Sequence, residues 1–228
     1  MNRPTLFSPP HLHDSRRWAG MRIGLFGGTF NPPHAGHVHA CTIAMKYLGL
    51  DAVWWMVTPG NPLKSKLNLP DITVRMDLCR NMITDPRIVV TNIEQHLGTF
   101  RTFDTIKALQ SRYSRTDFIW FSGTENAYEF PRWYKWQDLQ SLIPFAFVGR
   151  PTTSGLVRQN SFRMSAKLRQ TYPLHGIRPP LEKGRVYWIF AEKLMDISST
   201  HIRETSHTIA AQHKTDLISS PKKSTMKE

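Results

Sequence analysis

The chain has 228 residues, which suits one α/β domain and is short for two independent ones. Hydrophobic residues make up 40% of it, which excludes a wholly disordered chain, and no apolar run approaches the roughly 20 residues that a membrane-spanning helix needs. Lys and Arg number 30 against 17 Asp and Glu, and the resulting charge of +13 would attract polyanions such as nucleotides, nucleic acids or acidic membrane surfaces.

The two ends of the chain differ in composition from its middle. Residues 1–20 contain several Pro and His and have no apolar period, so we expect a flexible leader there. Residues 206–228 are rich in Ser, Lys and Thr, which predicts a disordered tail. A single domain is therefore expected over residues 21–205.

The cysteines and the first residues indicate the compartment. Cys41 and Cys79 fall in segments with helical spacing and have no Cys or His at metal-ligand spacing, so we interpret them as buried free thiols. No apolar signal core follows Arg16 and Arg17. These features predict a cytoplasmic protein.

From Met21 onward, short β-branched or aromatic runs alternate with segments of helical spacing. This order predicts a doubly wound α/β fold, in which helices cover both faces of a parallel sheet and ligands bind beyond the carboxyl ends of the strands. Residues 150–184 are richer in Pro, Arg, Gln and Ser and are expected to form an insertion before the last strand. The predicted strands are 22–26, 52–57, 88–90, 118–121, 145–148 and 186–190, and the predicted helices are 35–48, 71–83, 102–113 and 131–143.

The clearest chemical signal follows the first predicted strand. Two glycines, Gly27 and Gly28, allow a sharp turn and a close approach to a ligand, so the loop can present main-chain amides to a phosphate. His34 and His37 lie three residues apart at the start of a helix, where they can face the same way, and Gly36 leaves room for a polyphosphate at the helix's positive end. For an isolated pair, a glycine turn with two surface histidines is the alternative. The Lys-Ser/Thr ending of a P-loop is absent, which disfavours a P-loop NTPase.

A second signal follows the last predicted strand, in the string Ile197-Ser198-Ser199-Thr200-His201-Ile202-Arg203. Ser198 or Ser199 can cap a helix and leave the following amides for an anion. Arg203 falls in the first turn, where its positive charge opposes the helix dipole unless an anion is bound. The pattern favours phosphate binding, with an ordinary capped helix and a solvated Arg as the alternative.

These strings resemble elements of the nucleotidyltransferase superfamily. The first, residues 27–37, is similar to G-G-[ST]-F-[DN]-P-x-H-x-G-H, with Asn31 where Asp is more usual, and the string ending at Arg203 is similar to I-S-[ST]-T-x-I-R. Residues 123–136 resemble the G-x-D-x-x-x-x-F-x-x-W element of bacterial nicotinate-nucleotide adenylyltransferases, with Glu125 in place of Asp. Shorter similarities are T-x-D-T beginning at Thr102, N-P-x-K ending at Lys64 and a strand-end R-P at Arg150.

The resemblance, which covers about residues 21–205, implies a Rossmann-like nucleotidyltransferase fold and an activity. Such enzymes transfer the adenylyl group of ATP to nicotinate mononucleotide, giving nicotinate adenine dinucleotide and pyrophosphate in NAD biosynthesis. The implied catalytic residues are His34, His37 and Arg203. ATP binding is implied for Gly27, Gly28, Thr29, Phe30, Gly36, Ser199, Thr200 and Ile202, and binding of the mononucleotide for Lys64, Thr102, Glu125, Trp133, Tyr134 and Arg150.

The expected partners are therefore small molecules, with no nucleic acid and no membrane. No carboxylate cluster is evident in the sequence, so no metal site of the protein is expected and Mg²⁺ should arrive with ATP. The nearest alternative is another transferase of the superfamily, such as a phosphopantetheine adenylyltransferase or a cytidylyltransferase, whose chains are typically shorter and lack the Phe130…Trp133 element. A basic nucleic-acid-binding protein is the alternative from another class, and it would leave His34, Gly36 and His37 without a role.

Overall fold

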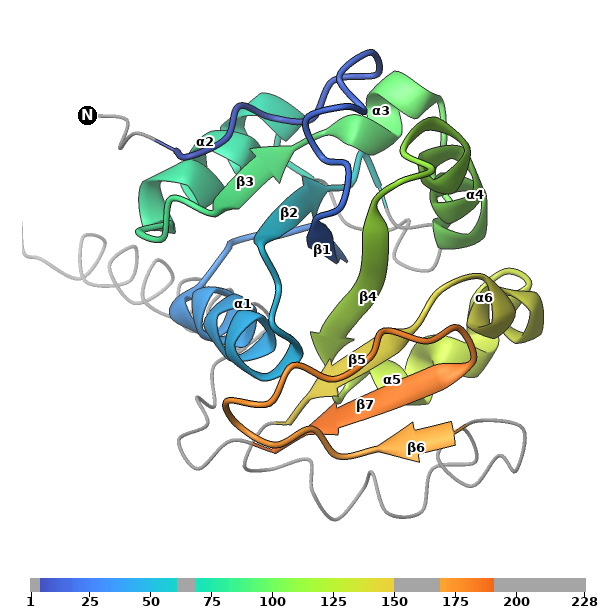
Figure 1. The fold of residues 1–228 in the computed structure, drawn as a ribbon. Helices are drawn as coiled ribbons and strands as arrows, with labels where there is room; N and C mark the ends of the chain where they lie inside the picture. Colours follow the sequence, from blue (N-terminus) through green and yellow to red (C-terminus); the bar gives the residue numbers. More distant parts are fainter. Residues whose placement is uncertain (1–4, 61–68, 150–168, 191–228) are drawn as a thin grey trace, which may run out of the picture.

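The computed structural model describes residues 5–60, 69–149 and 169–190. Their strands form one seven-stranded sheet in the order β3-β2-β1-β4-β5-β7-β6, and every neighbouring pair is parallel (Figure 1). The doubly wound α/β fold predicted from the sequence is confirmed. The strands are β1 (Arg22–Gly28), β2 (Ala52–Val57), β3 (Ile88–Thr91), β4 (Asp117–Gly123), β5 (Phe145–Val148), β6 (Arg169–Thr171) and β7 (Arg185–Ile189).

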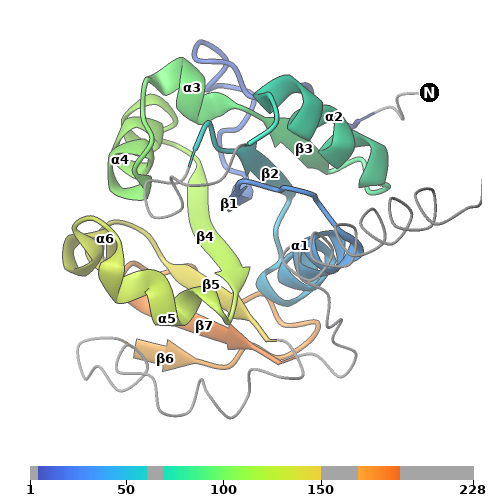
Figure 2. The ribbon, with the colours of Figure 1, turned by 180° about the vertical axis from the view of Figure 1, so that it is seen from behind.

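The helices lie on both faces of the sheet, as the views from the front and from behind show (Figures 1 and 2). One hydrophobic cluster joins side chains of α1 and α2 to one face, and the other joins side chains of α3, α4 and α6 to the opposite face. All six residues of β2 are buried because both faces of this central strand are covered. The helices are α1 (Ala35–Leu48), α2 (Ile72–Met82), α3 (Ile93–Leu97), α4 (Thr102–Arg112), α5 (Asn126–Glu129) and α6 (Trp136–Leu142), with a 3₁₀ turn η2 (Phe130–Arg132).

The ends of the two long helices on one face follow from local sequence signals. The side chain of Asp71 accepts a hydrogen bond from the backbone N–H of Thr73 at 2.8 Å and so caps the start of α2. Gly49 ends α1 with a φ of 61°, a left-handed conformation that glycine adopts without a Cβ clash. Both predicted helices are therefore confirmed, within one residue at either end.

The expectation of a flexible leader is wrong for residues 5–20. Trp18 is fully buried, with its ring 5.0 Å from that of Trp54, and Phe7 and Leu12 pack against the same cluster. The hydroxyl of Tyr113 donates a hydrogen bond to the carbonyl of His11 at 2.8 Å. Residues 5–20 therefore form an irregular segment that packs on the core, with Trp18 as its fully buried side chain.

The predicted helix over residues 131–143 is also wrong in part. The structure divides this region into α5, η2 and α6, because Lys135 has a φ of 50° and interrupts the helical path. Trp133 and Trp136 on either side of the break both pack against the core cluster. The helical spacing of these aromatic residues therefore arises from a bent segment, in which both Trp side chains reach the same core cluster.

Other differences concern short elements and the surface. Helix α3 and strand β6 were not predicted, and β6 lies within the expected insertion, whose residues 150–168 are outside the described part.

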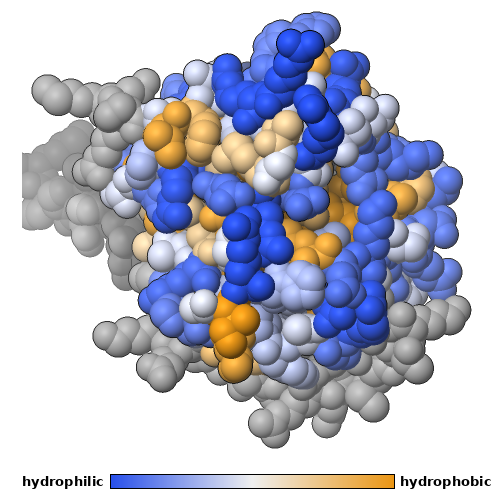
Figure 3. Space-filling view, viewed as in Figure 1, coloured by the Kyte–Doolittle hydropathy of each residue, from blue (hydrophilic) through white to orange (hydrophobic). Residues whose placement is uncertain are grey.

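Cys41 and Cys79 are buried and free, as predicted. Among the described residues, no helix has both the length and the apolar character that crossing a bilayer requires. On the face drawn in Figure 3, polar side chains cover most of the surface and the apolar ones show in separate patches.

Candidate functional site

Two of the segments that carry sequence motifs, residues 27–37 and 123–136, lie at the carboxyl edge of the sheet. Strand β1 lies between β2 and β4, and the chain reaches β2 on one side directly but β4 on the other side only after β3, α3 and α4. The β1–β4 junction is thus the point where the winding direction reverses, and ligands of doubly wound sheets bind in the crevice at such a point. The motif at residues 27–37 begins with the last two residues of β1, and the motif at residues 123–136 begins with the last residue of β4, so both border this junction.

The two glycines at the end of β1 permit the close packing of two aromatic rings. A Cβ on Gly27 would lie 2.5 Å from the ring of Trp120 in β4, and a Cβ on Gly28 would lie 3.0 Å from the ring of Phe30. Phe30 itself has a φ of 47°, which is unusual for a residue with a side chain and indicates that the loop is held by its surroundings. The loop that the sequence predicted to approach a phosphate closely is therefore a tightly packed, strained turn.

His34 and His37 come together at the start of α1, as their spacing predicted. Their rings stack with centroids 3.6 Å apart, and the backbone N–H of His34 donates a hydrogen bond to Nδ1 of His37 at 3.1 Å. The ring of His37 lies 5.0 Å from that of Phe30 and 5.9 Å from those of Phe26 and Trp55. These contacts fix the orientation of the His37 imidazole.

The start of α1 is suited to an anion. Its first turn contains no acidic residue, and Gly36 within it is buried. The first N–H groups of a helix have no partner within the helix, and the helix dipole places a partial positive charge there. The two imidazoles therefore stand at a position where main-chain N–H groups and the dipole already favour a phosphate.

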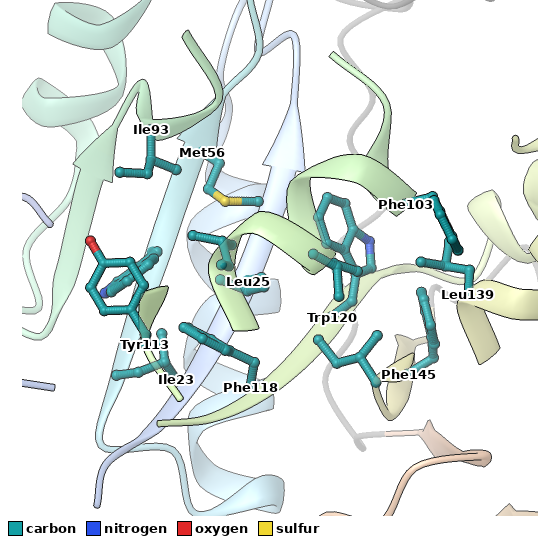
Figure 4. Close-up of a cluster of buried hydrophobic side chains, with 14 of the residues drawn as sticks. Ile23, Leu25, Met56, Ile93, Phe103, Tyr113, Phe118, Trp120, Leu139 and Phe145 are labelled. Carbon is teal, nitrogen blue, oxygen red and sulfur yellow. The ribbon is translucent and has the colours of Figure 1, made fainter. Parts of the chain in front are cut away.

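On the other side of the junction, aromatic residues connect the β1 loop to the segment after β4. The ring of Trp120 lies 5.9 Å from that of Trp133, edge to face, and Trp133 packs against Phe130 at 5.2 Å. Figure 4 shows Trp120 on the same side of the core as Phe103, in α4. Trp120 thus bridges Gly27 and Trp133, two residues that the sequence assigned to different substrates.

Tyr134 packs beside the start of α4, where Thr102 lies. Tyr134 is 43% exposed, and its ring lies 6.0 Å from that of Phe103, the residue after Thr102. The guanidinium of Arg101, the residue before Thr102, stacks on Tyr134 with its carbon 4.3 Å from the ring centroid. Lys135 lies over the rings of both Phe103 and Tyr134. An exposed aromatic surface flanked by cations is suited to a planar, anionic ligand.

Glu125 lies directly against the main chain of Gly123, because a Cβ at Gly123 would overlap the carboxylate oxygens of Glu125. Gly123 is the last residue of β4, so this carboxylate sits at the carboxyl edge of the sheet beside the β1–β4 junction. A side chain at position 123 would therefore have to displace the carboxylate of Glu125, which stands where the resembling element has Asp.

Sequence reasoning missed a buried arginine, Arg75 of α2. Its guanidinium donates hydrogen bonds to the carbonyls of Thr29 and Thr58, in the loops that follow β1 and β2. A signal was present, because Arg75 shares the spacing of Ile72, Met76 and Cys79, which form the apolar side of the helix. A charged residue on an apolar stripe indicates a specific partner.

A buried acid, Glu94 of α3, was missed as well. Thr105 of α4 donates a hydrogen bond from its hydroxyl to Oε1 of Glu94 at 3.1 Å. Burial raises the pKa of Glu94, and hydrogen bonds from the hydroxyls of Thr58 and Thr105 oppose that rise. The acid therefore connects the start of α4, where Thr102 lies, to the loop after β2.

Six further residues that the sequence assigned to the site, namely Lys64, Arg150, Ser199, Thr200, Ile202 and Arg203, lie outside the described residues. Within the described ranges, no group of three or more His, Cys, Asp or Glu side chains is arranged to hold a metal ion.

Comparisons with known proteins show similarities of both sequence and fold. The model of the cytidylyltransferase-like family matches residues 25–205. A protein of Ruegeria pomeroyi named nicotinate-nucleotide adenylyltransferase is 43% identical over 199 residues, which cover 85% of this chain and 90% of that protein. A protein of Cereibacter sphaeroides with the same name is 41% identical over 189 residues, covering 81% and 98%. The fold is similar to that of a solved Plasmodium falciparum nicotinic acid mononucleotide adenylyltransferase complexed with NaAD, with a TM-score of 0.60, 16% identity, and 81% and 83% of the two chains covered.

Proposed function

The chain belongs to the nicotinate-nucleotide adenylyltransferases of the cytidylyltransferase-like family, and we propose that the β1–β4 junction is where it joins ATP to nicotinate mononucleotide. In this reaction a phosphate oxygen of the mononucleotide attacks the α-phosphorus of ATP. A bond forms between that oxygen and phosphorus, the bond to the bridging oxygen breaks, and pyrophosphate leaves. The products are nicotinate adenine dinucleotide and pyrophosphate.

The observation that carries the assignment of the ATP side is the stacked pair of His34 and His37 at the start of α1. Because Nδ1 of His37 accepts a hydrogen bond from the His34 backbone, the neutral imidazole carries its proton on Nε2. The Nε2–H group can donate a hydrogen bond to a phosphate oxygen as negative charge shifts toward pyrophosphate. The Gly27–Phe30 loop and Gly36 complete this side with main-chain N–H groups and space for the triphosphate.

The mononucleotide side is proposed to comprise Thr102, Glu125, Trp133 and Tyr134. Trp133 and Tyr134 offer aromatic surface to the pyridine ring, and Arg101 and Lys135 beside Tyr134 give this side a positive charge that suits a carboxylate. Thr102 begins α4, and its hydroxyl can donate a hydrogen bond to that carboxylate. A ligand with a neutral amide in place of the carboxylate would lose these charge interactions.

The remaining assignments rest on the sequence motifs. Lys64, Arg150, Ser199, Thr200, Ile202 and Arg203 are proposed to contact phosphate groups or the mononucleotide. Mg²⁺ is proposed to enter with the ATP phosphates, where it would neutralise charge on the leaving pyrophosphate. The chain's own contribution is the positioning of two anionic substrates in line and the donation of hydrogen bonds to the transferring phosphate.

A direct assay of both pyridine mononucleotides tests the proposal. Purified protein is mixed with ATP, Mg²⁺ and either nicotinate or nicotinamide mononucleotide, and pyrophosphate release is measured. We expect kcat/KM to be higher for the acid by about tenfold or more, because the cationic side of the site would leave a neutral amide with fewer favourable contacts. Absence of pyrophosphate release with either acceptor, together with tight and salt-dependent binding of DNA or RNA in filter assays, would favour the nucleic-acid-binding alternative.

A further inference from the structure

Arg75 is a charged side chain enclosed by main-chain carbonyls. The residue is 2% exposed, and its Nε donates to the carbonyl of Pro70 at 2.9 Å. Its Nη1 donates to the carbonyls of Thr29 at 2.8 Å and Thr58 at 2.9 Å. The one hydrogen on Nε and the two on Nη1 are therefore all used, each by a different segment of the chain.

Burial of the Arg75 guanidinium without an acidic partner in the described part of the chain lowers the stability of the fold. Burial lowers the pKa of Arg75, but a guanidinium stays protonated at neutral pH. Within the described ranges, Arg75 forms no salt bridge, and Asp71, the acid that acts on its pKa, lies exposed at the start of the helix. A buried cation held only by carbonyls contributes less to stability than an apolar side chain of similar size would.

The three carbonyls belong to segments that shape the ATP side of the site. Thr29 lies between Gly28 and Phe30, and Phe30 is the residue with the strained, positive φ. Thr58 follows β2, and its N–H donates to the carbonyl of Gly28 at 3.0 Å. Arg75 therefore ties the glycine loop to the neighbouring loop and orients the peptide group that enters Phe30.

We propose that Arg75 is a positioning residue for ATP: it holds the Gly27–Phe30 loop against the loop after β2 and places a positive charge beneath the triphosphate. This inference rests on the proposed function, since it takes the glycine loop as the ATP site. Arg75 acts through main-chain groups and the electric field and makes no contact with the reacting atoms. In a poorly hydrated interior that field is screened much less than on the surface.

The test separates the hydrogen bonds of Arg75 from its charge. Arg75→Lys keeps the charge but cannot span three carbonyls, and Arg75→Met removes both. Arg80 lies on the same helix in an exposed pair with Asp77, so Arg80→Lys and Arg80→Met are matched controls. Each variant is examined for ATP binding by calorimetry without mononucleotide, for KM of each substrate and kcat, and for thermal unfolding.

We expect Arg75→Lys to raise the dissociation constant and KM for ATP by about tenfold, which corresponds to the loss of one charge-assisted hydrogen bond, and Arg75→Met to raise them further. The KM for the mononucleotide should change by less than about threefold, and the Arg80 variants should change ATP binding by less than about twofold. An Arg75→Lys protein that is merely less thermostable, with ATP binding unchanged, overturns the inference, as does one that no longer folds. Wild-type protein that binds no ATP would instead refute the proposed function.

Discussion

The backbone N–H of His34 donates a hydrogen bond to Nδ1 of His37 at 3.1 Å, so one member of the stacked pair fixes the tautomer of the other. The proton of the neutral His37 ring is thereby placed on Nε2. His34 and His37 are consequently unequal: the first supplies a main-chain donor and a stacking surface, and the second supplies the side-chain N–H.

Replacement of His37 by Ala should lower kcat by about 100-fold or more, because it removes a donor to the charge that develops on the transferring phosphate. The KM for ATP should change much less, since the interaction strengthens in the transition state. Steady-state kinetics of pyrophosphate release measure both. His39→Ala is a control on the same helix, two residues further and on another side. Unchanged kcat in His37→Ala would remove the catalytic assignment.

Replacement of Trp18 by Ala should lower the free energy of unfolding by about 3–5 kcal/mol, because a fully buried indole is removed from the core. Leu6 lies in the same segment and is 64% exposed, so Leu6→Ala should change the free energy of unfolding by less than about 0.5 kcal/mol. Urea denaturation followed by fluorescence gives both values. Equal effects of the two substitutions would contradict the anchoring role of Trp18.

Glu94 predicts a specific dependence of stability on pH. Burial raises its pKa above the ordinary value of 4.5, so the folded protein holds this proton more tightly than the unfolded chain does. The contribution of Glu94 to stability is then complete below pH 4.5 and is lost as the pH rises through the raised pKa. Urea unfolding across this window should show the decline in the wild type and its absence in Glu94→Gln.

Glu182 is a control of opposite sign for the same series. Hydrogen bonding from Arg185, the largest cause, lowers the pKa of this exposed acid, so its contribution is present at neutral pH and is lost as the pH falls below 4.5. In Glu182→Gln the unfolding free energy should lack that acid-side loss while the Glu94 decline persists. If the unfolding free energy of Glu94→Gln follows the wild-type curve over the whole pH range, burial of the Glu94 carboxyl does not cause the decline.

A Cβ at Gly27 should disturb both faces of the site, because it would meet the ring of Trp120 at 2.5 Å. Gly27→Ala is expected to cost about 1–3 kcal/mol of stability and to lower kcat/KM, since Trp120 must move and Trp133 packs on it. Gly60→Ala is the control, because a Cβ there meets nothing within 4 Å. The smaller ring in Gly27→Ala/Trp120→Phe should restore part of the stability; a double variant less stable than Gly27→Ala would argue against this clash.

The parallel sheet and the histidine pair could be predicted because each depends on local pattern. Buried runs such as residues 52–57, and signals such as Gly49 that end a helix, indicate the order of strands and helices. The three-residue spacing of His34 and His37 places both on the same side of α1. The motif residues on either side of the β1–β4 junction followed from that order, since parallel strands bring their carboxyl ends to one edge.

What could not be predicted depends on contacts between distant segments. Trp18 is buried against Trp54 in the cluster that also contains Tyr113. Lys135 adopts its left-handed conformation between Trp133 and Trp136, which both pack against that cluster. Arg75 carries a visible signal in its spacing, but its carbonyl partners lie 46 and 17 residues away in the chain. Such partners are defined by the folded structure alone.

The segment ahead of β1 has a consequence for the order of folding events. The carbonyl of Trp18 accepts a hydrogen bond from the hydroxyl of Thr116, a residue 98 positions later, and that of His11 accepts one from Tyr113, 102 positions later. On a ribosome, Trp18 and His11 must wait until 98 and 102 further residues have been synthesised before they find these partners. Because closing such long loops has a high entropic cost, we expect residues 5–20 to dock on the core late in folding.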